Sequence, residues 1–204
     1  MSRIARFIEP NGYYHVISRS VNETWILKDQ EDFHAFFRME LWAKEKFPIR
    51  LFHYVIMNTH FHYVLQAIDQ KTLSAHFSYL KWHYTKWVRQ KYGWKGPLWR
   101  ERYKSLPIEN EAYLSACGTY VEYNPVRAGI CDRPEDYPFS SSRKYSRKTS
   151  DSLLDEYGYV LKRDPEGDRI YRTEDAKVIF SGAGAIGSLF YVAKYDRRKH
   201  ACPH

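Results

Sequence analysis

The sequence predicts an α+β fold in which an antiparallel sheet carries helices on one face. Short segments rich in β-branched and aromatic residues alternate with longer segments whose apolar residues have helical spacing. Two of the short segments are separated by only three residues, as in a hairpin. The resulting order, β-α-β-β-α-β-α, is typical of a sheet covered by helices rather than of a helical bundle.

The first half of the chain supplies three strands and a helix. Tyr13–Ser20 follows the turn signal Asn11-Gly12 and is predicted to be a strand. Apolar residues at helical spacing predict a helix over Asp29–Phe47, with acidic residues near its start. Arg50–Met57 and Phe61–Ile68 are predicted to pair as a hairpin.

The middle of the chain supplies the remaining elements. Thr72–Tyr92 is predicted to be an amphipathic helix that ends at the breaker stretch Gly93 to Pro97. Arg102–Glu109 is expected to be a strand, and Glu111–Tyr123 a helix stopped by Pro125. Together these elements predict a ferredoxin-like βαββαβ arrangement.

The distribution of charge predicts two regions. Residues 1–149 carry the whole net charge of +8, whereas residues 150–204 are neutral overall. We therefore expect one domain over 1–149 and a C-terminal extension of unknown role over 150–204. Residues 133–152, which are polar and basic, are predicted to form a loop or a wrapping arm.

The composition also predicts the compartment. The chain has no run of eighteen apolar residues and no apolar stretch typical of a signal peptide at its start. Cys117, Cys131 and Cys202 are widely spaced and form no metal-binding pattern. We expect a cytoplasmic protein, associated with the nucleoid, without membrane contact.

Basic residues concentrate between Lys71 and Lys104, where nine of them face the single acidic residue Glu101. Such a density of positive charge is typical of proteins that neutralise phosphates, although a solvated face that confers solubility would have the same composition. Arg100, Arg102 and Lys104 interleave with Trp99 and Tyr103. Trp82, Tyr84 and Trp87 likewise lie among Lys81, Lys86 and Arg89, and this mixture favours stacking on unpaired bases or, equally, a packed aromatic face.

His60 and His62 form the first pattern that can carry chemistry. Alternation along a strand places both imidazoles on one face, with Phe61 on the other. Two neutral imidazoles can bind one divalent cation if a third ligand is present. Two surface histidines without a joint role are the alternative, but an apolar strand needs a reason to place two polar rings together.

A tyrosine near the end of the third predicted helix forms the second pattern. Tyr120 and Asn124 are four residues apart and share a helical face, so the Asn124 amide could complete a metal site beside Tyr120. A tyrosine needs activation to act as a nucleophile, because its ordinary pKa is near 10. Tyr123 is the competitor for this role, and either ring could instead be an ordinary packed aromatic.

Four ordered motifs, between about Ile8 and Arg143, resemble the REP-associated tyrosine transposases, which are single-tyrosine HUH transposases. They are GYYHVISRS, MNTHFHYVL, PLWRERYKS, and YVEYNPVRAGI followed by RPEDYPFSS. The chain departs from the family at Asn58-Thr59, where Pro-Asn is usual, and at Ser20, where glycine is usual. Neither departure removes a residue with reactive chemistry.

The resemblance implies an HUH nuclease fold and an enzyme that cuts and rejoins single-stranded DNA at REP-type hairpins. It implies that His60, His62 and Asn124 bind Mg²⁺ or Mn²⁺ and that Tyr120 forms a 5′-phosphotyrosine with a free 3′-OH. The partners would be single-stranded DNA and DNA hairpins, and the enzyme would be a monomer or a homodimer. The basic residues expected to contact DNA are Arg3, Arg6, Arg19, Lys81, Lys86, Arg89, Arg100, Arg102, Lys104 and Arg127.

Two other functions are compatible with this fold. Another HUH enzyme, such as a replication initiator or relaxase, would use the same chemistry for a different purpose. A nucleic-acid-binding protein without catalysis would need neither the histidines nor the tyrosine. The joint presence of His60, His62, Tyr120 and Asn124 argues against a protein that only binds nucleic acid. A replication initiator or relaxase is expected to carry an appended helicase or a long C-terminal domain, for which 204 residues leave no room, so the transposase is favoured.

Overall fold

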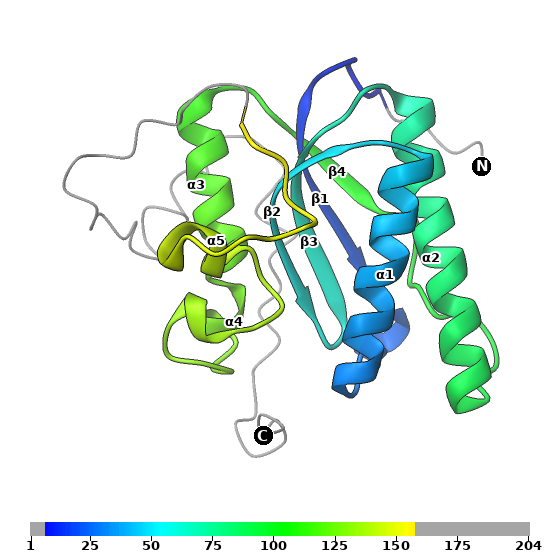
Figure 1. The fold of residues 1–204 in the computed structure, drawn as a ribbon. Helices are drawn as coiled ribbons and strands as arrows, with labels where there is room; N and C mark the ends of the chain where they lie inside the picture. The colour runs from blue at the N-terminus through cyan, green and yellow to red at the C-terminus, as the bar shows by residue number, and fades with distance from the viewer. Residues whose placement is uncertain (1–6, 158–204) are drawn as a thin grey trace.

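The computed structural model describes residues 7–157, which form a four-stranded antiparallel sheet covered by helices (Figure 1). The strands are β1 (Tyr13–Arg19), β2 (Arg50–Met57), β3 (His60–Gln66) and β4 (Lys104–Ile108). Their order in the sheet is β2-β3-β1-β4, with every neighbouring pair antiparallel. This order confirms the predicted ferredoxin-like arrangement.

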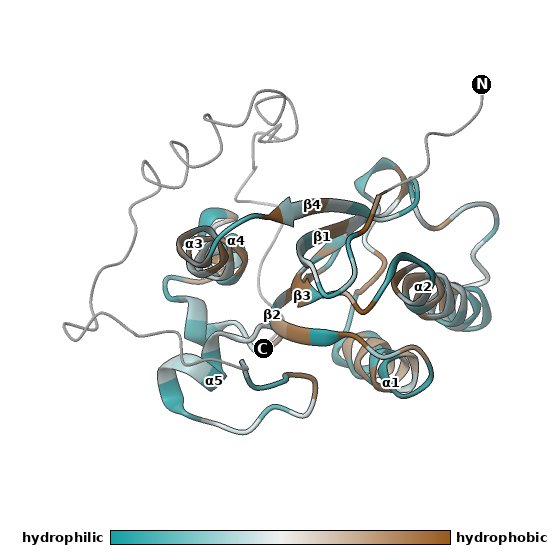
Figure 2. Cartoon of the chain, turned by 90° about the horizontal axis from the view of Figure 1, so that it is seen from above, coloured by the Kyte–Doolittle hydropathy of each residue, from teal (hydrophilic) through white to brown (hydrophobic). Residues whose placement is uncertain are grey.

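Helices cover both faces of the sheet, and this differs in part from the prediction. The two helices of the βαββαβ unit, α1 (Gln30–Lys46) and α2 (Gln70–Tyr92), pack side by side on one face, as expected. The helix that follows β4, α3 (Glu111–Glu122), packs on β2 and β3 from the opposite face (Figure 2). Apolar spacing shows that a helix has a buried side but not which face of a sheet that side meets.

The helix boundaries follow from local capping. The Asp29 carboxylate accepts a hydrogen bond of 3.0 Å from the backbone N–H of Asp32 and so begins α1. Asp69 begins α2 in the same way, through the N–H of Thr72 at 2.7 Å. Gly93 ends α2 in the left-handed conformation, at φ 63°, which glycine adopts without steric cost.

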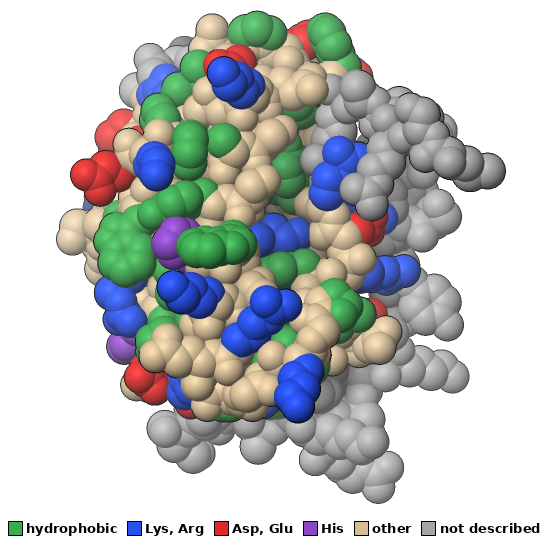
Figure 3. Space-filling view, turned by 90° about the vertical axis from the view of Figure 1, so that its right-hand side faces the viewer, with side chains coloured by type: hydrophobic (Ala, Val, Ile, Leu, Met, Phe, Trp, Pro, Cys, Tyr) green, Lys and Arg blue, Asp and Glu red, His purple; other side chains and the backbone are tan. Residues whose placement is uncertain are grey.

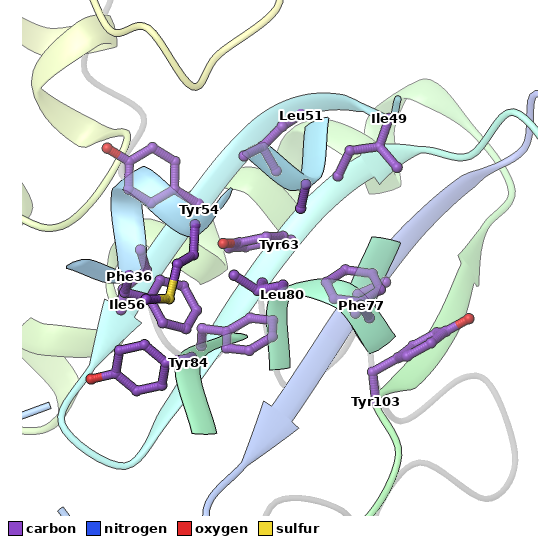
Figure 4. Close-up of a cluster of buried hydrophobic side chains, with 14 of the residues drawn as sticks. Phe36, Ile49, Leu51, Tyr54, Ile56, Tyr63, Phe77, Leu80, Tyr84 and Tyr103 are labelled. Atoms are coloured by element: carbon purple, nitrogen blue, oxygen red, sulfur yellow. The ribbon is translucent and has the colours of Figure 1, made fainter. Parts of the chain in front are cut away.

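Alternation along β3 divides its side chains between two apolar layers. Phe61, Tyr63 and Leu65 point into the main core between the sheet and α1 and α2. Figure 4 shows Tyr63 in this core beside Leu80 and Phe77, which come from α2. His60, His62 and Val64 therefore face the other layer, under α3, where Val64 packs with a smaller cluster of apolar residues. The periodicity of one strand thus separates the main core from the candidate site.

The chain after α3 wraps the free edge of β2. It contains the short helices α4 (Asn124–Arg127) and α5 (Ser142–Arg147), together with a 3-10 turn, η2 (Pro134–Asp136). Pro125 lies in the first turn of α4, where proline is tolerated, so it redirects the chain rather than stopping it.

Backbone hydrogen bonds fix this segment along the strand. The N–H of Ile56 donates to the carbonyl of Phe139 at 2.9 Å, and the N–H of Asp155 donates to that of Leu51 at 2.8 Å. An unpaired strand edge promotes association with other chains, so this cover protects β2. Of the two predicted alternatives for residues 133–152, a loop or a wrapping arm, the structure shows the wrapping arm.

Residues 150–157 of the predicted C-terminal extension pack against the same domain, with Leu153 buried. The rest of the extension lies outside the described residues. Within residues 7–157, no helix combines the length and the apolar character needed to cross a bilayer.

Candidate active site

The histidine pair lies at the start of β3, directly after the two-residue turn Asn58-Thr59. The rings of His60 and His62 are 5.1 Å apart between centroids, and both lie on the sheet face covered by α3. His62 is almost completely buried, at 1% exposure, whereas His60 is half-buried. The structure therefore brings together the two histidines that the sequence predicted as a pair.

Hydrogen bonds orient both imidazoles through the same ring nitrogen. Thr59 Oγ1 lies 2.8 Å from Nδ1 of His60, and Nε2 of His15 lies 2.9 Å from Nδ1 of His62. With each Nδ1 engaged, Nε2 of each ring is the nitrogen left for a ligand. Thr59, at which the sequence departs from the family that it resembles, thus orients His60.

His15 is a residue of the site that the sequence analysis missed. It occupies the middle of β1, is fully buried, and stacks on His62 with 5.2 Å between ring centroids. A single histidine in an apolar strand has no partner at a recognisable spacing. The available signal was its polar ring within the strand Tyr13–Ser20, on the same face as the Arg19 side chain.

Burial keeps the three imidazoles neutral. It lowers the pKa of His60 to about 3, with a further contribution from Arg19. It lowers the pKa of His15 to about 3, helped by Arg127, and lowers the pKa of His62 well below its usual value. Neutral imidazole is the form that binds a metal ion, so the pair fits the predicted divalent cation.

The histidine pair needs a further ligand of another type. Across residues 7–157 there is no cluster of three or more His, Cys, Asp or Glu side chains that could hold a metal ion. An amide oxygen, a water or a DNA phosphate would have to complete the coordination of Mg²⁺ or Mn²⁺, which prefer oxygen ligands.

Tyr120 lies over the histidines. Its ring is 5.9 Å from that of His15 and 6.3 Å from that of His62, edge-on in both cases. The Arg127 guanidinium carbon is 4.0 Å from the centre of the Tyr120 ring, and the same side chain donates to the Tyr120 carbonyl at 2.7 Å. Burial raises the pKa of Tyr120, while the charges of Arg127 and Arg19 act in the opposite direction.

Tyr123 faces a different environment. Burial raises the pKa of its hydroxyl, as do the carboxylates of Glu135 and Glu122. Within the described part of the chain, Tyr123 makes no ring contact with any of the three histidines. The structure thus places Tyr120, and not Tyr123, beside the histidine pair.

Asn124 caps the helix that carries Tyr120. Its Nδ2 donates hydrogen bonds to the carbonyls of Tyr120 at 3.1 Å and Val121 at 3.0 Å. Both carbonyls lie in the last turn of α3, where side chains commonly supply hydrogen bonds that the helix itself does not. If Asn124 also binds a metal ion, its amide oxygen must do so, and this role stays a prediction.

A close contact between α3 and β2 fixes how the helix lies on the sheet. A Cβ atom on Gly118 would lie only 2.4 Å from Nε2 of His53, so glycine is needed at this point of closest approach. His53 Nδ1 lies 2.8 Å from Glu122 Oε1, which also accepts a hydrogen bond of 2.7 Å from the Ser141 hydroxyl. This network joins β2, α3 and the wrapping arm two residues beyond Tyr120.

The predicted DNA-contacting cations differ in their surroundings. Arg19 pairs in register with His60, and Arg127 contacts Tyr120, so both flank the site. Arg100 lies close by in the chain path, since its N–H donates to the Arg19 carbonyl at 3.0 Å. Three side chains have intramolecular partners: Lys81 and Arg89 donate to backbone carbonyls, and Lys104 forms an ion pair with Glu101. Lys86 and Arg102 are exposed, whereas Arg3 and Arg6 lie outside the described residues.

Most of the aromatic residues considered for base stacking belong to the protein interior. Tyr84 and Tyr103 are buried in the main core. The indole N–H groups of Trp87 and Trp99 are hydrogen-bonded to Asp32 and to Thr85, respectively. Trp82 is the exception, at 59% exposure. Of the two predicted alternatives, the packed aromatic face therefore holds for four of these five residues, and base stacking stays open for Trp82.

Comparisons with known proteins connect this geometry to a family. A family model described as Transposase IS200 like matches residues 9–124. A protein of Haemophilus influenzae that bears the name REP-associated tyrosine transposase is 27% identical over 108 residues, which cover 48% of this chain and 61% of that protein. The chain thus spans less than two thirds of this relative's length.

A solved structure, of a REP-associated tyrosine transposase bound to a REP hairpin, has the same fold. It aligns with a TM-score of 0.61 and 18% identity, over 83% of this chain and 99% of that chain. Because the family model spans more than half of the chain, the protein belongs to the IS200-like transposase family.

Proposed function

We propose that the protein is a metal-dependent single-strand DNA endonuclease and strand transferase that uses Tyr120 as its nucleophile. The observation that carries this proposal is the meeting of His60, His62 and Tyr120 on one face of the sheet, with Arg19 and Arg127 beside them. A binding protein without catalysis has no need for two neutral histidines oriented through Nδ1 next to a tyrosine. The hairpin bound by the solved relative supports REP-type hairpins as the substrate class.

The side chains divide the reaction between them. His60 and His62 would hold Mg²⁺ or Mn²⁺ through Nε2, and the bound ion would polarise the scissile phosphate. The Tyr120 oxygen attacks phosphorus and loses its proton, a new O–P bond forms, and the bond from phosphorus to the 3′ oxygen breaks. That oxygen takes up a proton to leave a free 3′-OH, and the 5′ phosphate stays on Tyr120.

Rejoining is the reverse of this step. A 3′-OH attacks the phosphorus of the phosphotyrosine and loses its proton, the phosphodiester forms, the bond from phosphorus to the Tyr120 oxygen breaks, and that oxygen takes up a proton. The charges of Arg127 and Arg19 act on Tyr120, and in this proposal they would neutralise the phosphate during both steps.

Covalent trapping tests the proposal. The full-length protein is incubated with Mn²⁺ and hairpin oligonucleotides that carry single-stranded flanks, and a denaturing gel then detects a protein–DNA adduct. The adduct should form, and it should disappear with EDTA. His60→Ala and His62→Ala should abolish it while retaining hairpin binding, because most phosphate contacts lie elsewhere.

Two outcomes would contradict the proposal. Hairpin binding without an adduct under any divalent cation would indicate a DNA-binding protein without catalysis. Cleavage that survives in His60→Ala or His62→Ala, with DNA binding lost instead, would remove the histidines from the metal site.

A further inference from the structure

The outer surface of α1 and α2 carries a second cluster of aromatic and basic side chains. These two helices lie on the opposite side of the sheet from α3, the helix that carries Tyr120 (Figure 2). At its centre is an open hollow of about 580 Å³ lined by Trp42, Glu45, Lys46, Tyr79 and His83. We call these residues, together with Trp82 and Lys86, the α1/α2 aromatic surface. Figure 3 shows this side of the molecule, with exposed hydrophobic side chains around a histidine and cationic side chains next to them.

The rings of this surface gather around one imidazole. The ring of His83 is 4.1 Å from that of Tyr79, 4.6 Å from that of Trp82 and 6.4 Å from that of Trp42. Trp82 is 59% exposed and Trp42 is 48% exposed. Exposed hydrophobic residues scattered singly need no explanation, but two indoles beside one hollow indicate a binding surface.

The charge of the surface identifies the kind of ligand. Lys46 Nζ lies 5.2 Å from the centre of the Tyr79 ring, and Lys86 Nζ lies 5.7 Å from that of Trp82. Neither lysine takes part in an ion pair found among residues 7–157. Burial lowers the pKa of His83, and the charges of Lys86 and Lys46 lower it further, so both cations act on a ring that lines the hollow. Glu45 is the one carboxylate in the lining.

We propose that the α1/α2 aromatic surface binds unpaired nucleotides of the DNA substrate at a second site, with bases stacked on Trp82 and Trp42 and phosphates near Lys46 and Lys86. Planar exposed rings interleaved with unneutralised lysines match the two chemical features of single-stranded DNA. A protein partner would bury the same rings but would gain little from the lysines. The site would hold a strand segment outside the hairpin, since the sheet separates it from Tyr120.

This inference rests on the proposed function for its choice of DNA as the ligand. It is tested with two probes, which are a hairpin without a tail and the same hairpin with a single-stranded tail of about 20 nucleotides, longer than most single-strand binding sites. Fluorescence anisotropy gives the Kd of each probe for the full-length protein and for Trp82→Ala. Phe7→Ala, which removes another exposed aromatic ring outside the surface, is the matched control.

Trp82→Ala should weaken binding of the tailed hairpin by roughly 10-fold and leave the tail-less hairpin unchanged. Lys46→Gln combined with Lys86→Gln should make the Kd of the tailed probe less dependent on salt concentration and leave the salt dependence of the tail-less probe unchanged. Equal affinity of wild type and Trp82→Ala for the tailed hairpin would overturn the inference and point to a protein partner. An equal loss with both probes would also overturn it, because Trp82 would then contribute to hairpin binding and not to binding of the tail. Adduct formation on a substrate with short flanks should persist in Trp82→Ala, so failure here is distinguishable from failure of the Tyr120 mechanism.

Discussion

His15 contacts the one nitrogen of His62 that a metal ion would not use. Its Nε2 lies 2.9 Å from His62 Nδ1, so it orients that ring, and when His62 Nδ1 donates in this contact, His62 Nε2 is left unprotonated for a metal ion. The histidine pair was predictable from its spacing. His15 was not, because its role depends on the pairing of β1 with β3, and the sequence does not state the register of that pairing.

This contact predicts that His15 acts as a positioning residue. His15→Leu should weaken Mn²⁺ binding to the hairpin complex by about 10–100-fold, the usual effect of losing a partner of a metal-binding histidine. His15→Gln, which can still hydrogen-bond to His62 Nδ1, should recover part of the loss. Free Mn²⁺ measured by electron paramagnetic resonance gives the affinity directly. His34→Gln, at an exposed position of α1, is the control. If His15→Leu binds Mn²⁺ as tightly as His34→Gln does, His15 is not a positioning residue.

At the level of single elements, the sequence predicted which segments form strands and helices but not how they lie on one another. The bounds of β2 are those predicted, and α1 and α2 differ by only one or two residues at their ends, because caps and apolar spacing are local signals. The face of the sheet that α3 covers depends on a contact distant in sequence, between Gly118 and His53. No local pattern reveals such a contact.

The approach of α3 to β2 predicts the effect of a single methyl group. Gly118→Ala should destabilise the protein by about 1–3 kcal/mol, as overpacking does, because the His53 ring is held by Glu122 and cannot move freely. It should also slow adduct formation, since α3 carries Tyr120. Urea denaturation gives the free energy of unfolding.

Replacing His53 by alanine as well should recover part of this loss, since it makes room for the new methyl group. Fully additive losses in the double variant would show that the contact does not determine how α3 docks.

The cap of α1 predicts a pH dependence of stability. Hydrogen bonds from Lys91 lower the pKa of Asp29 below 3.8, outweighing the opposite effect of burial. A carboxylate with a lowered folded-state pKa stabilises the protein above its unfolded-state pKa, and this stability is lost as the pH falls through the folded-state value. Asp29→Ala should therefore cost about 1 kcal/mol at pH 7, the usual value of an N-cap.

The cost of Asp29→Ala should shrink as the pH falls below 3.8. Chemical denaturation of wild type and variant at pH 7 and pH 3 measures the difference at each value. A cost that is the same at both would show that the charge of Asp29 contributes nothing.

For the whole molecule, the sequence predicted the excess of positive charge but not how many of the cations are free to contact DNA phosphates. Of the nine basic residues between Lys71 and Lys104, some are engaged by carboxylates or carbonyls of the protein, as Lys91 and Lys104 are. Exposed side chains without such partners among residues 7–157 are Lys71, Lys86, Lys95, Arg100 and Arg102.

Five phosphate contacts of this kind predict that the affinity for single-stranded DNA falls steeply as the salt concentration rises. If each exposed cation contacts one phosphate of a single strand, log K against log salt should have a slope of about −3.5. Anisotropy titrations from low to moderate salt measure the slope. A flat dependence would show that the basic residues serve solubility alone.

Peptide mapping tests most directly whether Tyr120 is the residue that becomes joined to DNA. After reaction with a hairpin oligonucleotide and Mn²⁺, the protein is digested with nuclease and protease, and mass spectrometry locates the residual nucleotide. The contacts of Tyr120 with His15 and His62 predict that the nucleotide is on Tyr120. Tyr120→Phe should fold, bind DNA and form no adduct, whereas Tyr123→Phe should form it normally. Nucleotide mass on Tyr123, or an adduct that survives in Tyr120→Phe, would contradict this role of Tyr120.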